Sequence, residues 1–407
     1  MKKFLALTLA LVMSLSLVAC GDKKTDDTKT DEPDQKTEQP AENEGAYKVA
    51  MITDYGDITD QSFNQTTYEA CKAFAEDNGV EFSYFKPAGD NTADRVAMIE
   101  KAADEGYNVI VMPGYAFGGA IVEAAPEFPD VKFIALDVAA GDLLETAVAN
   151  AGESYDYNPS NWDLNKYVDM SNVYCAVYQE ELCGYMAGYA AVKLGYTHLG
   201  VLGGMAVPAV QRFGYGFVQG ADAAAVEMGI ADQVVMEYAY GNQFYGDSDI
   251  TAYMDNWYQT LGVEVVFASG GGIYTSAAEA AAKVGGKLIG VDVDQSANID
   301  TYGEGMCVTS AMKGLAETVK HMLGEVVAGN FANYGGQVET LGLVNGDDPT
   351  ANYVQLPMET TQWGDGFTQD DYKALVKAMY DGDVTVSNDI SAMPATTITV
   401  NFAGNIK

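Results

Sequence analysis

The stretch YKVAMITDYGDITDQSFNQTTYEACKAFAED, residues 47–77, decides the fold. Its apolar run at 47–53 predicts a buried β-strand, because the run is short and ends in a polar loop. Residues 61–77 then predict a helix. A strand that passes through a loop into a helix is the first half of a βαβ unit.

The same alternation continues along the chain. Further strands are predicted at 80–84, 108–112, 131–137, 173–177, 198–203, 233–238, 263–268, 287–291 and 305–311. Helices are predicted at 91–105, 118–128, 180–194, 208–228, 315–328 and 369–380. Short apolar runs that alternate with helical patterns predict parallel sheets and an α/β fold. The residues from 335 onward are expected to form a hairpin region.

Two successive runs of this kind predict two Rossmann-like lobes with a cleft between them. The part of the chain after residue 46 has about 360 residues, which exceeds the usual size of one hydrophobic core. The expected lobes are residues 47–178 plus 296–330 and residues 179–295 plus 331–407. A ligand is expected in the cleft, at the carboxyl ends of the strands. The irregular acidic stretch 141–170 is predicted as a surface insertion.

The first 46 residues predict export and a lipid anchor. Lys2 and Lys3 precede an apolar run that is too short to span a membrane, so residues 1–19 are expected to be a signal peptide. The run ends in LVACG, a bacterial lipobox, which predicts cleavage before Cys20 and a lipid on its sulfur. Residues 20–46 contain no aromatic residue and predict a flexible linker. The expected location is the extracytoplasmic face of the cell membrane.

Charge and residue usage argue against several functions. The formal net charge of -36 would repel the phosphates of nucleic acids. His198 and His321 lie far apart in the sequence, so neither a metal site nor a histidine-based triad is predicted. The cysteines after Cys20 show no CxxC spacing and are expected to behave as small hydrophobes: Cys71, Cys175, Cys183 and Cys307. The sequence therefore predicts neither a metal nor another cofactor.

The segment 52–64, ITDYGDITDQSFN, holds the first candidate ligand-binding residues. It follows the first strand and opens the first helix, so its end faces the mouth of the cleft. Phe63 could stack on a flat ring, and Asn64 could pair with the edge of that ring. The alternative is that Asp60 or Ser62 caps the helix while Phe63 enters the core.

Several motifs, in the same order along the chain, resemble those of the basic membrane protein family. They are DQSFN at 60–64, EELCGYMAG at 180–188, LGGM at 202–205, RFGYGF at 212–217, IGVDVDQ at 289–295 and TSAMK at 309–313. Members of that family are lipid-anchored proteins of the type I periplasmic binding fold that serve ABC transporters for purine nucleosides. The resemblance implies a monomeric substrate-binding protein, not an enzyme, that works with an ABC permease and an ATPase.

The resemblance also implies which residues bind the base. Phe63 and Asn64 would contact the purine, and Phe244 would close the sandwich as the second aromatic residue. The surrounding segment is rich in tyrosine, so Tyr240 or Tyr245 could be the second stacking residue instead.

Five polar or glycine positions complete the implied site. Asp137, which closes its strand, would hydrogen-bond the base edge. Asp292 and Lys313 would hold the ribose hydroxyls, because a diol donates well to a carboxylate and a buried lysine can donate to sugar oxygens. Asp54 and Gly271 are weaker candidates for the sugar side.

Other functions are open at this point. The solute could be a different small molecule, such as a sugar. A nucleoside hydrolase would need an activated water, and Asp54, Asp57 and Asp60 could imitate an aspartate-rich metal motif, although the last two are better explained as turn and cap residues. A surface adhesin could use the stretch 141–170 to bind a partner.

Overall fold

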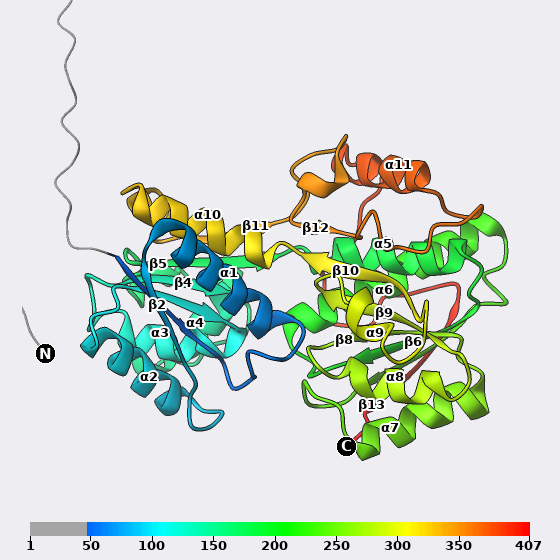
Figure 1. The fold of residues 1–407 in the computed structure, drawn as a ribbon, viewed down its shortest axis with the longest axis horizontal. Helices are drawn as coiled ribbons and strands as arrows, with labels where there is room; N and C mark the ends of the chain where they lie inside the picture. The colour runs from blue at the N-terminus through cyan, green and yellow to red at the C-terminus, as the bar shows by residue number, and fades with distance from the viewer. Residues whose placement is uncertain (1–46) are drawn as a thin grey trace, which may run out of the picture. The chain divides into compact units, whose positions relative to one another are not determined.

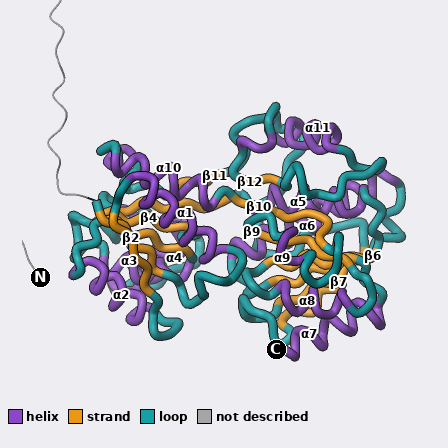
Figure 2. Tube along the Cα trace, viewed as in Figure 1, coloured by secondary structure: helices purple, strands orange, loops and turns teal. Residues whose placement is uncertain are grey.

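The computed structural model describes residues 47–407, which form two α/β lobes (Figure 1). The predicted signal peptide at 1–19, the lipidated Cys20 and the linker at 20–46 lie outside the described residues. Each lobe is a mainly parallel sheet that lies between helices, as the strands and helices in Figure 2 show. The predicted α/β fold class is confirmed.

The first lobe is built on a six-stranded parallel sheet of order β11-β5-β4-β3-β1-β2. Its strands are β1 Lys48–Ile52, β2 Glu81–Phe85, β3 Val109–Pro113, β4 Lys132–Leu136, β5 Val173–Tyr178 and β11 Val338–Leu341. Its helices are α1 Phe63–Asn78, α2 Thr92–Asp104, α3 Gly118–Ala124, α4 Ala140–Asn150 and α10 Leu315–Val327. Because side chains alternate along a strand, Met51 joins the hydrophobic cluster under α1, whereas Ile52 joins the cluster under α2 and α3.

The second lobe is built on a seven-stranded sheet of order β12-β10-β9-β8-β6-β7-β13. Its strands are β6 His198–Gly203, β7 Val235–Tyr240, β8 Val265–Ser269, β9 Lys287–Asp292, β10 Cys307–Lys313, β12 Val354–Gln355 and β13 Thr399–Asn405. Only β12 pairs antiparallel among these described strands. Its helices are α5 Glu180–Lys193, α6 Pro208–Met228, α7 Ser248–Asp255, α8 Tyr274–Ala282, α9 Ser296–Ile299 and α11 Gln369–Tyr380.

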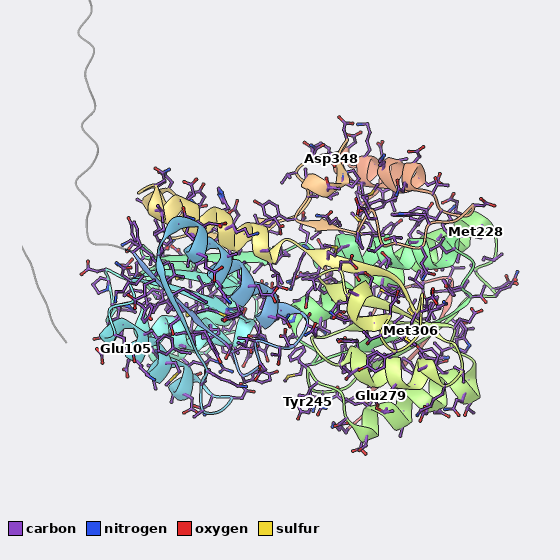
Figure 3. The ribbon with its side chains drawn as sticks, viewed as in Figure 1. Glu105, Met228, Tyr245, Glu279, Met306 and Asp348 are labelled. Carbon is purple, nitrogen blue, oxygen red and sulfur yellow. The ribbon has the colours of Figure 1, made fainter. Side chains whose placement is uncertain are left out.

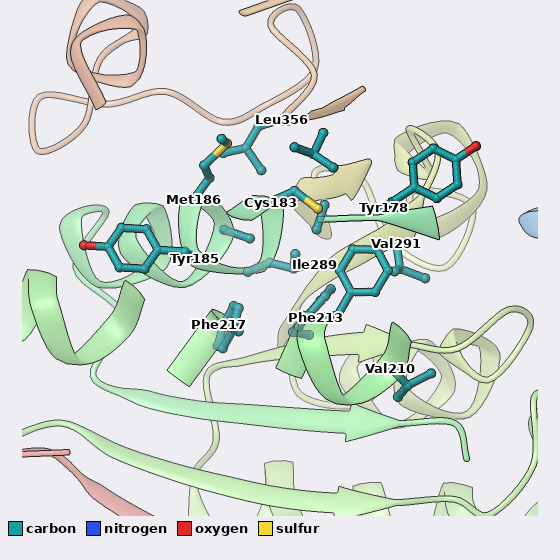
Figure 4. Packing of buried hydrophobic residues seen from close by; sticks show 14 of the residues in the cluster. Tyr178, Cys183, Tyr185, Met186, Val210, Phe213, Phe217, Ile289, Val291 and Leu356 are labelled. Carbon is teal, nitrogen blue, oxygen red and sulfur yellow. The ribbon is translucent and has the colours of Figure 1, made fainter. Parts of the chain in front are cut away.

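Glycines let α5 and α6 pack backbone against backbone. A Cβ atom on Gly184 would overlap the carbonyl oxygen of Phe213, and one on Gly216 would overlap that of Glu181. Figure 4 shows the buried side chains that surround this helix pair, Phe213 among them. The close approach brings together the N-terminal halves of the two helices, which carry charged residues of the site described below.

Two parts of the predicted lobe division are wrong. β10 lies in the range 296–330 that was expected in the first lobe, but it pairs in parallel with β9 in the second sheet. β11 lies in the range 331–407 that was expected in the second lobe, but it pairs in parallel with β5 in the first sheet. An apolar pattern predicts that a segment is a strand, whereas its neighbour depends on which sheet edge is free.

The hairpin expected after residue 335 is also not formed. The three strands of this region, β11, β12 and β13, pair with three different partners: β5, β10 and β7. The chain therefore crosses between the lobes after β5, after β10 and after β11.

The predicted surface insertion at 141–170 is wrong in its first third. α4 begins at Ala140 and buries Leu143, Leu144 and Val148. These residues have helical spacing, which the acidic and irregular sequence after them obscured. The remaining stretch, 151–167, is mostly exposed and contains two short 3-10 turns. None of the helices within 47–407 is long and apolar enough to cross a membrane.

Candidate functional site

A cavity of about 400 Å³ lies between the two sheets, at the carboxyl ends of their strands. All eight residues that the sequence analysis placed in a ligand site line this cavity: Asp54, Phe63, Asn64, Asp137, Phe244, Gly271, Asp292 and Lys313. Residues from both lobes thus face one space, as expected for a cleft that encloses a ligand.

Asp60 organises the start of α1. Its carboxylate accepts hydrogen bonds from the backbone N–H groups of Ser62, Asn64 and Gln65, at 2.9, 2.9 and 3.0 Å. The capping role proposed for Asp60 is therefore confirmed, yet Phe63 lines the cavity instead of entering the core. The two interpretations of this segment were not exclusive.

The same carboxylate orients the side chain of Asn64. The Nδ2 atom of Asn64 donates to Asp60 Oδ2 at 3.1 Å. Because Nδ2 is a donor and the carboxylate is an acceptor, this bond decides which way the amide is turned. Asn64 Oδ1 is then left buried without a hydrogen-bond partner. A ligand with an N–H or O–H group would satisfy this oxygen.

Asp54 lies next to Asn64 in the first lobe. Its Oδ1 accepts from the backbone N–H groups of Tyr55 and Gly56, both at 2.6 Å. Burial raises the pKa of this carboxyl above its usual range, and these backbone bonds and the Asn64 side chain partly oppose that rise. Asp54 and Asn64 together form a patch of acceptor oxygens.

Aromatic rings from both lobes meet in the cleft. Tyr55 of the first lobe and Phe244 of the second lie with ring centroids 6.4 Å apart, and Phe63 lies 4.8 Å from Lys313 Nζ. A Cβ atom on Gly204 would come within 2.5 Å of the Phe244 ring, so this glycine makes room for the ring.

Of the two tyrosines considered as alternatives to Phe244, Tyr240 is in the core of the second lobe. Tyr245, labelled in Figure 3, lines the cavity but leaves 59% of its surface exposed.

Lys313 is at the centre of a buried charge cluster. Its Nζ forms ion pairs with Asp137, with Glu180 at 3.4 Å and with Asp292 at 3.6 Å. Burial alone would lower the pKa of the ammonium group, but the three carboxylates together raise it above its usual value. Burial raises the pKa of Asp137 to about 6, against the opposing effect of Lys313. Asp137 lines the cavity, and its Oδ1 is a second buried acceptor without a hydrogen-bond partner.

The structure groups these residues differently from the implied roles. Asp137 was expected at the base edge, apart from the sugar-binding pair of Asp292 and Lys313. It lies instead against Lys313, in the same cluster as Asp292. The acceptors next to Phe63 at the start of α1 are Asn64 and Asp54.

Sequence reasoning missed four residues that belong to the site. Glu180 is fully buried and binds both Lys313 and Arg212, whose Nε donates to Glu180 Oε2 at 2.6 Å. Arg212, Tyr55 and Asp142 line the cavity. Glu180 and Arg212 each stand in a motif quoted for the family resemblance, and Tyr55 stands in the segment 52–64. Asp142 was hidden because its helix was interpreted as an insertion.

Besides the ion pair between Lys313 and Asp137, further hydrogen bonds join the lobes across the cleft. The hydroxyl of Ser62 donates to Asp292 Oδ2 at 2.6 Å, and Gln295 Nε2 donates to the carbonyl oxygen of Gln61 at 3.1 Å. Gln61, Asp137 and Asp292 all have positive φ angles, of 57°, 60° and 66°. Such backbone conformations are costly for non-glycine residues and are typical of ligand-binding sites.

The described residues contain no cluster suited to a metal ion. The four cysteines between 47 and 407 are buried and form no disulfide. The hydrolase interpretation of Asp54, Asp57 and Asp60 gains nothing from the geometry, because Asp57 instead binds Lys86 and the Thr59 hydroxyl, both at 2.9 Å.

Comparisons with known proteins identify the family of the chain. Residues 47–347 match the family model Bmp, described as ABC transporter substrate-binding protein PnrA-like. The chain is 25% identical over 317 residues to the ABC transporter nucleoside-binding protein BmpA of Lactococcus lactis, an alignment that covers 74% of this chain and 80% of that protein. It is 24% identical over 304 residues to basic membrane protein B of Borreliella burgdorferi, which covers 74% and 79%.

A solved structure supports the fold. An ABC transporter solute-binding protein from Conexibacter woesei aligns with a TM-score of 0.62 at 22% identity, over 84% of this chain and 99% of that one. The family is one of solute-binding proteins and not of enzymes. The match to most of the chain shows that this protein belongs to the Bmp family of PnrA-like ABC transporter substrate-binding proteins.

Proposed function

We infer that this protein captures a purine nucleoside in the cleft and presents it to an ABC importer. The observation that carries the proposal is the pairing of aromatic rings with buried, unpartnered acceptor oxygens. Phe63, Tyr55 and Phe244 offer apolar faces to a flat ring. The Oδ1 atoms of Asn64 and Asp137 each lack a donor. A nucleoside has a flat base, N–H groups on the base edge and O–H groups on the sugar.

The geometry suggests how the nucleoside lies. The base edge would meet Asn64 and Asp54 beside Phe63, and the ribose hydroxyls would meet Asp137 and Asp292. Lys313 would stabilise the two ribose-binding carboxylates. Because the base end offers acceptors, guanosine and inosine, whose N1 carries a hydrogen, are expected to bind more tightly than adenosine. The relative from Lactococcus lactis is named for nucleoside binding, which supports this ligand class.

Isothermal titration calorimetry tests the ligand class. Guanosine, inosine, adenosine, ribose, arabinose and glucose would each be titrated into the full-length protein in detergent. We expect one nucleoside to bind per chain and the free sugars to give no measurable heat. A panel in which a sugar binds and every nucleoside fails would contradict the proposal.

We also propose that the protein is a monomer held at the extracytoplasmic face of the cell membrane by a lipid on Cys20. The lipobox at residues 17–21 supports the anchor, and two or more acyl chains on one cysteine would hold a protein firmly on a membrane. A membrane location would keep the loaded protein close to the permease and its ATPase. Mass spectrometry of the protein purified from the membrane fraction should find acyl chains on Cys20 at the start of the chain, and a membrane-bound protein with an unmodified Cys20 would contradict the anchor.

A further inference from the structure

The last strand of the second lobe lies beyond the region that matches the family model. β13 runs parallel to β7 along its whole length, with Thr399 beside Val235 and Asn405 beside Tyr240. The backbone N–H of Ile406 continues this pairing by donating to the carbonyl oxygen of Tyr240 at 2.8 Å. The strand thus follows β7 to its carboxyl end.

The loop that follows β7 carries Phe244 into the cleft. The loop, residues 241–247, is attached to the neighbouring strand end by two backbone bonds, from Gly241 to Gly203 at 2.8 Å and from Asn242 to Gly204 at 3.0 Å. Asn242 has a φ of 59°, a conformation that its surroundings must hold in place. The position of Phe244 therefore depends on what fixes the rest of this loop.

Asp247 fixes the far side of the loop, and Lys407 binds it. Asp247 Oδ1 caps α7 by accepting from the backbone N–H of Ile250 at 3.0 Å. Its Oδ2 accepts from Gln243 Nε2 at 2.9 Å and from Lys407 Nζ. Gln243 also donates to the carbonyl oxygen of Tyr245 at 2.8 Å, so these bonds bracket Phe244 on both sides.

The carboxylate of Asp247 stays ionised near neutral pH. The backbone N–H of Ile250 and the ammonium group of Lys407 lower the pKa of Asp247 to about 2. β13 also contacts β7 through side chains, because the ring of Phe402 lies near those of Tyr238 and Tyr240, with centroids 5.5 and 6.1 Å apart.

We propose that β13 and Lys407 are a positioning element for Phe244, which sets the affinity of the cleft for a flat-ringed ligand without touching that ligand. β13 extends the sheet to the base of the 241–247 loop, and Lys407 joins Asp247 and Gln243 on the loop itself. The proposal rests on the proposed function, because Phe244 has to meet the ligand's ring. It assigns a role to residues 399–407, which lie outside the region that matches the family model.

The test compares Lys407→Ala with Lys283→Ala in the full-length protein, with guanosine as the probe. Lys283 pairs with Asp255 at 2.7 Å in the same lobe, at similar exposure, but away from the Phe244 loop. We expect Lys407→Ala to raise the guanosine Kd about three- to fivefold, since exposed ion pairs contribute up to ~1 kcal/mol. Lys407→Arg should restore affinity, and Lys283→Ala should leave it unchanged.

Two readouts separate positioning from plain stabilisation. In stopped-flow measurements the loss should appear as faster dissociation, and the thermal unfolding midpoint of Lys407→Ala should match that of Lys283→Ala. Asp247→Asn, which keeps an oxygen for the α7 cap but removes the charge, should reproduce the change in Kd.

Three outcomes would overturn the proposal. One is a Lys407→Ala chain with the wild-type Kd. Another is an equal loss of affinity in Lys283→Ala, which would indicate a general charge effect. The third is a wild-type chain that binds no nucleoside, which would contradict the proposed function and this proposal together, whereas the first two contradict the positioning role alone.

Discussion

The two ends of the cleft are built differently. At the charged end, Lys313 is 2% exposed and is surrounded by the carboxylates of Asp137, Glu180 and Asp292. At the aromatic end, Phe63 and Phe244 are only partly buried, and Asn64 Oδ1 has no partner. The charged end satisfies most of its own polar groups, while the aromatic end leaves surface and an acceptor for something else to cover.

The charged end, whose Asp137 and Asp292 are also the proposed ribose ligands, thus has a second task in the fold that the aromatic end does not have. Lys313 pairs with Glu180 and Asp292 within the second lobe, and Asp137 joins them from the first lobe; these pairs stabilise the fold because unpaired charges are costly in a low-dielectric interior. Aromatic rings that are partly exposed in a cleft cost the folded protein little stability when the ligand is absent. Substitutions at the charged end should therefore act first on stability, and substitutions at the aromatic end should act first on affinity.

The largest expected effect is that of Glu180→Ala. It removes the buried carboxylate between Lys313 and Arg212 and leaves both cations without that partner, which should lower the free energy of unfolding by about 3–5 kcal/mol. Urea unfolding followed by circular dichroism measures the change. Asp255→Ala breaks the more exposed pair with Lys283 and should cost less than ~1 kcal/mol. If Glu180→Ala cannot be purified, Glu180→Gln offers a milder test, and wild-type stability in either variant would contradict the comparison.

Phe63→Ala, at the aromatic end, should lower the affinity for the ligand more than the stability of the fold. Loss of a ring that stacks on a base costs about 1–3 kcal/mol, so the nucleoside Kd should rise about 5- to 150-fold. Phe74→Ala is the matched control, because Phe74 is partly buried on the same helix and does not line the cavity. Calorimetry should show the affinity loss in Phe63→Ala and not in Phe74→Ala. Equal Kd values for the two variants would show that Phe63 is a packing residue.

The sequence predicted local structure and cleft residues well, for a physical reason. Strand and helix periods are local properties, so β6 and α6 were predicted with the bounds that the structure has. The family resemblance implied that Asp137 and Lys313 lie in the cleft, and both line it because the carboxyl ends of parallel strands converge there.

The sequence could not show which strands pair with one another or which side chains form ion pairs. Nothing local to β10 or β11 says which sheet receives it, and nothing near Glu180 says that Arg212, on another helix, will be its partner. The grouping of Asp137 with Lys313 depends on how the two lobes meet. The pairing of Asp60 with Asn64, which leaves the amide oxygen without a partner, is a three-dimensional detail of the same kind.

Asp142 lines the cavity but forms no ion pair within residues 47–407. It therefore tests whether a buried carboxylate destabilises the fold when it lacks a cation such as Lys313. Burial raises the pKa of Asp142 to about 6, above the ordinary value of 3.8. The folded state then binds more protons than the unfolded state between these pH values. Stability from this group is present below about pH 4 and is lost as the pH rises through 6. Asp142→Asn should match the wild type at pH 4 and exceed its unfolding free energy by about 2 kcal/mol at pH 8.

Urea unfolding at both pH values measures this difference. The variant keeps an oxygen that can accept the Ala139 N–H bond at the start of α4, so the cap is preserved. A constant difference between variant and wild type from pH 4 to pH 8 would show that Asp142 is not a destabilising charge.

The smallest expected effect concerns the bond that joins the two ends. Ser62 belongs to the start of α1 at the aromatic end, and its hydroxyl donates to Asp292 of the charged end. Ser62→Ala removes one bond across the cleft, so it should weaken the closed state by about 1 kcal/mol and raise the nucleoside Kd about fivefold.

Thr350→Ala is a control that removes an exposed hydroxyl–carboxylate bond outside the cleft. Its hydroxyl also donates to a carboxylate, that of Asp348 at 2.7 Å, but within the second half of the chain and away from the cleft. If closure depends on contact between the ends, only Ser62→Ala should bind more weakly in calorimetry, and both variants should unfold at the wild-type temperature. An unchanged Kd in Ser62→Ala would mean that this bond does not contribute to closure, and that the remaining contacts between the lobes, such as the Lys313–Asp137 pair, are sufficient for it.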